Sequence, residues 1–267
     1  VVFGGFAPKE LAARIDDARP AVVVTASGGL EPKRTVEYLP NVAEALAAAA
    51  HRVNHVVVAE RAGFTHTPQE YDGAHGTAWH DWDALAADAS PAGPVSVAAT
   101  DPLYILYTSG TTGVPKGVML THFNLRSNAL QGKAWMHGAQ EGKEVIYGVL
   151  PMFHAFGLTL YLTFSILTGS RLVLFPKFDV DLVMDAAKKS KPTVFCAVPP
   201  IYEKTALESK KRGIDLSTIR YAISGAMTLP ASTVKLWEEV SGGLLVEGYG
   251  LTESSPVALG NPFAESR

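Results

Sequence analysis

The chain has 267 residues, of which 47% are hydrophobic and 18% are charged, and its formal net charge is −3. This length allows one large domain or two small ones with a sizeable core, and the composition is ordinary for an α/β protein. The small net charge argues against the strongly basic surface with which proteins bind nucleic acids or anionic membranes. We therefore expect neither as a partner.

The single cysteine, Cys196, lies in an apolar run at residues 193–198, and we expect it to pack in the core. One cysteine cannot form a disulfide within the chain, which fits a reducing, cytoplasmic setting. The most apolar stretch, residues 158–175, is interrupted at residues 169–171, so its uncharged part is too short to span a bilayer. No leader pattern precedes the first residues and neither end carries a capping pattern, so we expect a piece of a longer protein.

Residues 1–100 are expected to form an N-terminal α/β part. Its helices are predicted over residues 8–18, 42–50 and 79–88, and its strands over residues 21–25 and 55–59. Residues 61–77 show no periodicity and are predicted to form a surface loop. Four histidines lie in or beside this loop at spacings that do not resemble a compact metal site: His55, His66, His75 and His80.

Residues 90–101, with three alanines, two prolines and a glycine, are the clearest connector in the chain. Beyond it, strands are predicted over residues 103–107, 118–121, 145–150, 171–175, 193–198, 219–224 and 244–247. Helices are predicted over residues 123–136, 157–167, 180–189, 200–211 and 230–240. This alternation indicates βαβ units and therefore an α/β fold, with largely parallel sheets covered by helices and with residues 101–267 as its core.

Residues 107–122 read Tyr-Thr-Ser-Gly-Thr-Thr-Gly-Val-Pro-Lys-Gly-Val-Met-Leu-Thr-His and follow a predicted buried strand. Glycines let a backbone bend closely around an anion, and hydroxyls, amides and one lysine supply the donors that a polyphosphate needs. A flexible linker is the alternative, but linkers lack a Pro-Lys-Gly exit between two strand-like runs. Gly117 and Val118 follow Lys116, so no hydroxyl is placed for magnesium as in a Walker A motif.

Two more segments follow predicted strands. Doubly wound sheets bind ligands at the carboxyl ends of their strands, so both segments are candidate sites. The run Leu-Pro-Met-Phe-His-Ala-Phe-Gly at residues 150–157 places His154 just past a strand and at a helix start. A histidine among such neighbours is either a site residue or a packed or capping residue. The run Ile-Ser-Gly-Ala-Met at residues 223–227 either lets a flat ring lie against the backbone or is only a tight turn.

A last segment, residues 246–253, reads Val-Glu-Gly-Tyr-Gly-Leu-Thr-Glu. Its Gly-x-Gly start invites a dinucleotide interpretation, but Glu253 stands where that motif needs a small residue. A carboxylate there suits a magnesium ion carried by phosphates. Tyr249 could stack on adenine or pack in the core.

These segments, in this order, resemble the adenylate-forming superfamily of acyl-CoA synthetases, aryl-CoA ligases, luciferases and peptide-synthetase adenylation domains. The resemblance covers nearly the whole chain and is most specific at residues 107–117. Residues 1 to about 115 look like the acetyl- and propionyl-CoA synthetase branch, and residues from about 118 to 267 look like long-chain fatty acyl-CoA ligases. We therefore predict a mosaic joined within residues 108–118.

The resemblance implies that a carboxylate attacks the α-phosphate of ATP, that pyrophosphate leaves, and that coenzyme A then takes the acyl group. The residues implied to act in catalysis are Lys116, His154, Thr252 and Glu253, with Glu253 as the Mg²⁺ ligand and His154 beside the acyl carboxylate. The residues implied to bind the nucleotide are Thr108, Ser109, Gly110, Thr111, Thr112, Gly113, Lys116, Gly225, Ala226, Met227, Glu247, Gly248, Tyr249, Gly250 and Thr252. A medium- or long-chain fatty acid is favoured, because most pocket positions follow the predicted join.

The sequence has no counterpart of the family's later ribose-binding segment, its hinge, or its C-terminal small domain with the catalytic lysine. We therefore expect the central part of the large domain, and whether this chain by itself is an enzyme stays open. The alternative is a non-catalytic nucleotide- or acyl-binding fragment. An NAD-binding oxidoreductase is disfavoured because no complete Gly-x-Gly-x-x-Gly is present.

Overall fold

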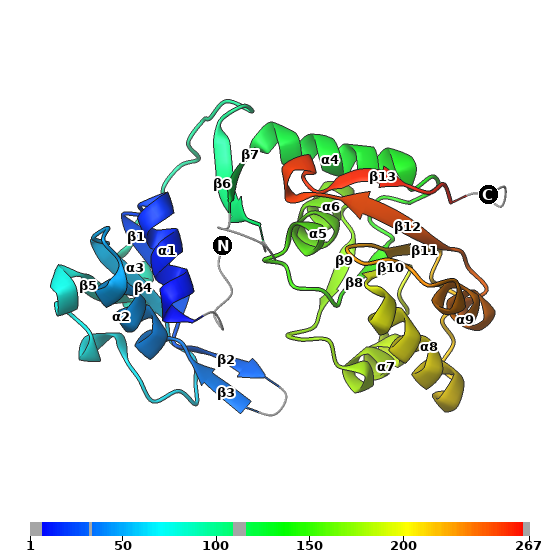
Figure 1. The fold of residues 1–267 in the computed structure, drawn as a ribbon, viewed down its shortest axis with the longest axis horizontal. Coiled ribbons are helices and arrows are strands. Elements are labelled where there is room, and N and C mark those ends of the chain that lie inside the picture. Colours follow the sequence, from blue (N-terminus) through cyan, green and yellow to red (C-terminus); the bar gives the residue numbers. More distant parts are fainter. Residues whose placement is uncertain (1–6, 32–33, 109–115, 264–267) are drawn as a thin grey trace. The chain divides into compact units, whose positions relative to one another are not determined.

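A computed structural model of the chain describes residues 7–31, 34–108 and 116–263. The chain folds as two compact units, an N-terminal unit of residues 1–97 and a C-terminal unit of residues 98–267 (Figure 1). The predicted phosphate-binding residues Ser109, Gly110, Thr111, Thr112 and Gly113 lie outside the described residues.

The N-terminal unit is built on a three-stranded parallel sheet in the order β1-β4-β5. The strands are β1 (Val22–Ala26), β4 (His55–Ala59) and β5 (Ala78–Asp81), and the helices are α1 (Pro8–Ala18), α2 (Leu39–Ala48) and α3 (Trp82–Asp88). Helices α1 and α2 bury Ile15 and Leu39 against Val56 and Val58 of β4. A hairpin of β2 (Gly28–Glu31) and β3 (Arg34–Glu37), which the sequence analysis missed, completes the unit.

One sequence prediction in the N-terminal unit needs correction. A helix was predicted from residue 79, but Ala78–Asp81 form β5 and the helix begins at Trp82, because the Asp81 carboxylate accepts a hydrogen bond from the N–H of Ala84 at 2.7 Å and caps it. The parallel pairing of β4 with β5 also brings His55 and His80 together, with Nδ1 and Nε2 at 3.1 Å. Among the described residues, no group of three or more side chains could hold a metal ion.

The C-terminal unit is built on a six-stranded sheet in the order β13-β12-β11-β10-β8-β9 (Figure 1). The strands are β8 (Val145–Gly148), β9 (Arg171–Leu174), β10 (Val194–Ala197), β11 (Tyr221–Ser224), β12 (Leu245–Gly250) and β13 (Val257–Gly260). All neighbouring pairs are parallel except β12 and β13, which are antiparallel. The sequence analysis did not predict β13.

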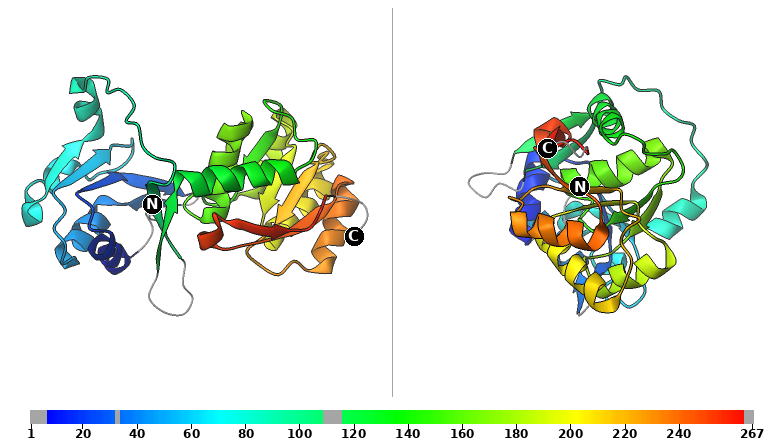
Figure 2. Two further views of the ribbon diagram at one scale, coloured as in Figure 1. Left: turned by 90° about the horizontal axis from the view of Figure 1, so that it is seen from above. Right: turned by 90° about the vertical axis from the view of Figure 1, so that its right-hand side faces the viewer.

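Helices cover both faces of this sheet (Figure 2). They are α4 (His122–Trp135), α5 (Ala155–Gly157), α6 (Phe164–Thr168), α7 (Val180–Lys189), α8 (Pro199–Arg212) and α9 (Ala231–Ser241), and a π-helical turn, Leu158–Thr163, joins α5 to α6. Alternate strand residues face opposite sides, so that Phe195 packs with α7, α8 and α9 while Cys196 packs with α6 and the π-helical turn. The predicted α/β fold with a largely parallel, doubly covered sheet is confirmed, and Cys196 is buried as predicted.

The strands on either side of residues 109–115 do not belong to this sheet. Strands β6 (Pro102–Tyr107) and β7 (Gly117–Thr121) form a separate antiparallel pair. Only nine residues, 108–116, separate them along the chain, and a parallel pair needs a crossover of about a dozen residues or more, so the two strands pair in antiparallel fashion. The first of the four candidate segments therefore does not follow a strand of the six-stranded sheet. The strand predicted at residues 103–107 is present as β6, but its predicted burial is wrong, because Leu103 and Ile105 are 46% and 36% exposed.

In the described part of the chain, no helix has the length and apolar character needed to cross a membrane.

The largest side chain buried in the C-terminal unit is Trp237 of α9, which is 0% exposed. Its ring stacks on Phe195 at 5.5 Å and meets the edge of Tyr202 at 4.7 Å. We expect Trp237→Ala to lower the free energy of unfolding by about 3–5 kcal/mol, because it leaves a cavity at the centre of this cluster. Urea denaturation followed by circular dichroism measures the loss.

Phe123→Ala is the matched control for this prediction, because Phe123 lies in the same unit and is 56% exposed. Its effect should stay within about 0.5 kcal/mol. Equal losses in the two variants would contradict the assignment of Trp237 to the core.

Candidate functional site

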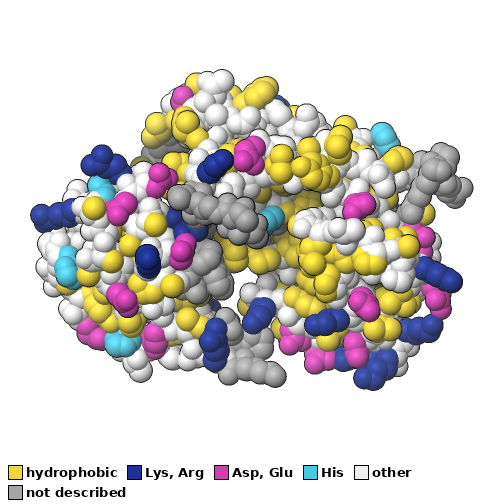
Figure 3. Space-filling view, viewed as in Figure 1, with side chains coloured by type: hydrophobic (Ala, Val, Ile, Leu, Met, Phe, Trp, Pro, Cys, Tyr) yellow, Lys and Arg dark blue, Asp and Glu magenta, His cyan; other side chains and the backbone are white. Residues whose placement is uncertain are grey.

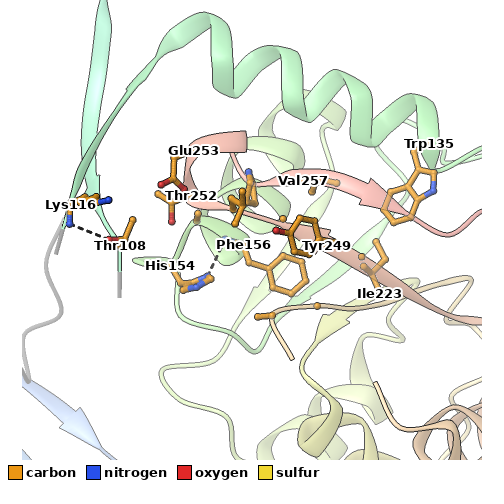
Figure 4. A pocket seen from close by; sticks show the side chains of 17 residues that line it. Thr108, Lys116, Trp135, His154, Phe156, Ile223, Tyr249, Thr252, Glu253 and Val257 are labelled. Atoms are coloured by element: carbon orange, nitrogen blue, oxygen red, sulfur yellow. Dashed lines mark hydrogen bonds between the residues drawn. The ribbon is translucent and has the colours of Figure 1, made fainter. Parts of the chain in front are cut away.

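The C-terminal unit contains a cavity of about 500 Å³ at the carboxyl ends of β11 and β12 (Figure 4). It is lined by Thr108, Lys116, Trp135, His154, Ala155, Phe156, Ile223, Gly225, Ala226, Gly248, Tyr249, Gly250, Leu251, Thr252, Glu253, Pro256 and Val257. Hydrophobic side chains gather on the surface where α5 and β12 lie (Figure 3). The cavity therefore combines apolar walls with a small number of polar groups, which is the usual character of a small-molecule site.

One end of the cavity is polar. Thr108 and Lys116 close the β6–β7 hairpin there, since the N–H of Thr108 donates to the carbonyl of Lys116 at 3.0 Å and the N–H of Lys116 donates to Oγ1 of Thr108 at 3.1 Å. Figure 4 shows Thr252 and Glu253 at this same end. The polar end thus brings a lysine, two threonines and a carboxylate to one place.

Thr252 and Glu253 lie on a 3₁₀ turn, Thr252–Ser254, directly after β12. The N–H of Leu251 donates to the carbonyl of Pro256 at 3.0 Å, which closes the loop behind the turn. The buried Thr159 hydroxyl of the π-helical turn donates to the carbonyl of Ser255 at 2.8 Å. These contacts fix the position from which Glu253 faces the cavity.

His154 stands between the polar end and the apolar walls. Its Nδ1 accepts a hydrogen bond from the N–H of Phe156 at 3.2 Å and so caps α5. Burial lowers the pKa of His154 below its ordinary value of 6.5. Because Nδ1 is the acceptor, the neutral ring carries its proton on Nε2. His154 therefore caps a helix and also lines the cavity, while its role as a site residue stays a prediction.

Glycines allow the strand ends to approach one another across the cavity. A Cβ at Gly225 would lie 3.2 Å from the carbonyl oxygen of Gly248 and 3.3 Å from the ring of Phe156. A Cβ at Gly250 would lie 2.2 Å from the carbonyl oxygen of Pro256, so only glycine fits there. Ala226 has a φ of 65°, which turns the chain sharply away after β11. The glycines therefore let the strand ends, the loop at Pro256 and the ring of Phe156 pack closely in the cavity wall.

The structure brings most of the described candidate residues together, but two lie elsewhere. Met227 does not line the cavity and its side chain is 53% exposed. The carboxylate of Glu247 accepts a hydrogen bond from the N–H of Leu229 at 3.3 Å and lines a separate hollow beside α9. Glu247 faces away because alternate residues of β12 point to opposite sides, and Leu245 and Glu247 lie on the side of α9. The alternation ends at Tyr249, where the pairing with β13 shifts its register and the side chain lines the cavity.

The sequence analysis assigned no role to several lining residues. They are Trp135, Ala155, Phe156, Ile223, Leu251, Pro256 and Val257. Each is apolar and cannot be told from a core residue by pattern alone. Pro256 and Val257 were missed also because the sequence analysis did not predict β13, which begins at Val257.

The histidine can be tested by its titration. Titration of His154 by NMR should give a pKa below 6.5, because burial disfavours the charged ring. A group with a lowered pKa in the folded state takes its proton more readily when the chain unfolds. The folded state should therefore lose stability as the pH falls below about 6.5, and His154→Gln should remove this part of the pH dependence. A pKa at or above 6.5 would contradict the burial of the ring.

The comparisons with known proteins agree with this geometry. The sequence profile of the AMP-binding enzyme family matches residues 1–267. A long-chain-fatty-acid–CoA ligase of Bacillus subtilis (strain 168) is 44% identical over 155 residues, which are 58% of this chain and 28% of the ligase. The mitochondrial acyl-CoA synthetase short-chain family member 3 of Homo sapiens is 40% identical over 176 residues, which are 60% of this chain and 25% of the synthetase. The chain thus spans less than a third of the length of these two relatives.

A solved structure extends the likeness to the fold. The anthranilate CoA ligase AuaEII in complex with anthranoyl-AMP superposes with a TM-score of 0.76 and 22% identity, over 100% of this chain and 48% of that chain. Relatives of both branches named in the sequence analysis match, while the position of the join stays a prediction. The match of the family profile over the whole chain, together with the cavity at the ends of β11 and β12, shows that the chain belongs to the AMP-binding enzyme family.

Proposed function

We propose that this chain supplies the nucleotide- and acid-binding core for the ATP-dependent activation of a carboxylic acid, with a medium- or long-chain fatty acid favoured. An oxygen of the substrate carboxylate forms a bond to the α-phosphorus, and the bond from that phosphorus to the pyrophosphate oxygen breaks. The products are pyrophosphate and an acyl-adenylate, from which the thiol of coenzyme A takes the acyl group and AMP leaves. The observation that carries the proposal is a single cavity with a polar end, an apolar end and a histidine between them.

At the polar end, Lys116 neutralises charge on the triphosphate and the leaving pyrophosphate. Thr108 and Thr252 add hydroxyl donors, with Thr252 beside the α-phosphate. These groups are held in place before the reaction, because backbone hydrogen bonds fix both the hairpin and the turn that carry them. Preorganised donors stabilise developing charge without reorganisation, which is the main source of catalysis in phosphoryl-transfer sites.

A magnesium ion fits the donors at this end. Mg²⁺ is commonly held by one or two carboxylates, with phosphate oxygens and water as the other ligands. Glu253 provides one carboxylate beside Lys116, so it would hold the ion, which neutralises phosphate charge when bound.

The neutral His154 is suited to orient the acid. Its Nε2–H can donate to a carboxylate while Nδ1 stays engaged with the backbone of Phe156. A neutral donor leaves the carboxylate more nucleophilic than a cation would, because it does not hold the negative charge as strongly. We assign His154 to positioning the attacking oxygen.

Adenine is assigned to the part of the cavity that Gly225, Ala226 and Gly248 line, where Tyr249 can stack on the ring. Gly225 matters because it lets the ends of β11 and β12 and the ring of Phe156 pack closely at this part of the wall. The fatty acid preference and the coenzyme A step rest on the family alone.

The proposal is tested by ATP–pyrophosphate exchange with a panel of carboxylic acids, and by calorimetric binding of ATP. Exchange that depends on an acid supports activation. Binding without exchange in the complete protein that contains this chain would support the alternative of a non-catalytic binding module. Absence of both would overturn the proposal.

The role of Lys116 gives a first quantitative prediction. Lys116→Ala should weaken ATP binding by about 1–3 kcal/mol, because a charge-assisted contact to phosphate is lost. Lys204→Ala is the charge-matched control, since Lys204 lies exposed on α8 and does not line the cavity. Calorimetry measures both, and equal affinities in the two variants would count against the phosphate site.

The role of Glu253 gives a second prediction. Glu253→Gln should raise the Mg²⁺ concentration needed for half-maximal ATP binding by about tenfold or more, because the amide keeps the shape but loses the charge. Glu238→Gln, on α9 and outside the cavity, serves as the control. An unchanged Mg²⁺ requirement in Glu253→Gln would exclude this residue as a ligand.

A further inference from the structure

The apolar end of the cavity is closed by one large ring. Figure 4 shows Trp135 at the end opposite Lys116, with Ile223 beside it and with Phe156 and Val257 nearer the middle. We propose that Trp135 determines acyl-chain specificity by setting the upper limit on the length of the chain that this cavity accepts. The inference rests on the proposed function and adds to it a residue that selects among acids.

The orientation of the acid follows from the chemistry of the two ends. Its carboxylate must lie near His154 and the polar end, where the phosphates are bound. Its hydrocarbon must then point along the apolar walls, since burial there removes it from water. That direction leads to the indole ring of Trp135, so a growing chain meets this ring last.

Three contacts hold the ring in place. Nε1–H of Trp135 donates to the carbonyl of Asn261 at 3.1 Å. A Cβ at Gly260 would lie 2.3 Å from the indole Cζ2, so the ring packs directly on the backbone of this glycine. The ring of Phe263 lies at 5.0 Å between centroids. Because these contacts hold the indole ring on several sides, the ring does not move easily to admit a longer acyl chain.

The helix that carries Trp135 is itself hydrogen-bonded to the adjacent strand β13. On α4, Nδ2 of Asn128 donates to the carbonyl of Val257 at 2.8 Å, and Oδ1 of Asn128 accepts from the N–H of Val257 at 3.1 Å. Asn128 is buried, and the two bonds replace those that a neighbouring strand would make with β13. Strand β13 is therefore attached to α4 at Val257 and, just beyond its end, at Asn261.

A purely structural role for Trp135 is the competing explanation. If the ring only stabilises β13, its removal weakens the binding of every acid by a similar factor. If the ring limits length, its removal changes the ratio of the Kd for long-chain acids to the Kd for short-chain acids. This ratio therefore separates the two explanations.

The test uses non-hydrolysable acyl-adenylate analogues with unbranched chains of roughly four to roughly sixteen carbons, whose Kd is measured by calorimetry. The protein is the natural full-length chain that contains these residues. In Trp135→Ala, the Kd of the longest analogue divided by that of the shortest should fall by about tenfold or more relative to the wild type, since even one methylene that fits or clashes changes binding by about this factor. Trp135→Phe should shift the ratio in the same direction by a smaller factor.

Phe123→Ala is the matched control, because Phe123 lies on the same helix, is exposed and does not line the cavity. Its ratio should equal that of the wild type. If Trp135→Ala does not fold, as judged by circular dichroism, the ratio in Trp135→Phe decides.

An unchanged ratio in the folded Trp135 variants, or a uniform loss across all lengths, would overturn the inference while leaving the proposed function standing. Failure of the wild type to bind any analogue or AMP would instead overturn the proposed function and the inference with it.

Discussion

The site depends on the parallel pairing of β11 with β12. Their register places Ser224 opposite Glu247, so the two chains leave the sheet together and Gly225 comes to lie against Gly248. At this contact there is no room for a larger side chain without moving a backbone carbonyl or the ring of Phe156. The part of the cavity proposed to hold adenine, and the turn that carries Thr252 and Glu253, both follow this contact.

A second constraint connects the hairpin to the cavity wall. Helix α4 begins immediately after β7, where the Thr121 side chain accepts from the N–H of Asn124 at 3.1 Å and Asn124 bonds back to the N–H of Thr121. The same helix then binds the main chain of β13 through Asn128 and Trp135. One rigid element therefore spans from the hairpin that flanks residues 109–115 to the strand that closes the apolar end.

The two ionisable groups Lys116 and His154 have different surroundings. Partial desolvation lowers the pKa of His154, although part of the residue stays exposed, and so favours the neutral ring. Lys116 lies on the exposed edge of the hairpin. In the proposed function the lysine is the group that meets the phosphates, and the neutral ring is the donor to the carboxylate.

Local sequence determined most of the elements and supports the proposed phosphate site at the β6–β7 hairpin. The bounds of α1, α7 and β4 follow from short-range patterns, and the glycines, hydroxyls and Lys116 of residues 108–117 are the basis of that proposal. Tertiary structure decided what depends on contacts between distant segments. It placed β6 and β7 outside the main sheet, turned Glu247 away from the cavity, and used Asn128 and Trp135 to hold β13, some 126 to 129 residues further along the chain. The physical reason is that an apolar or amide side chain has the same local pattern in a core as in a cavity wall, and only the packing of remote segments makes it one or the other.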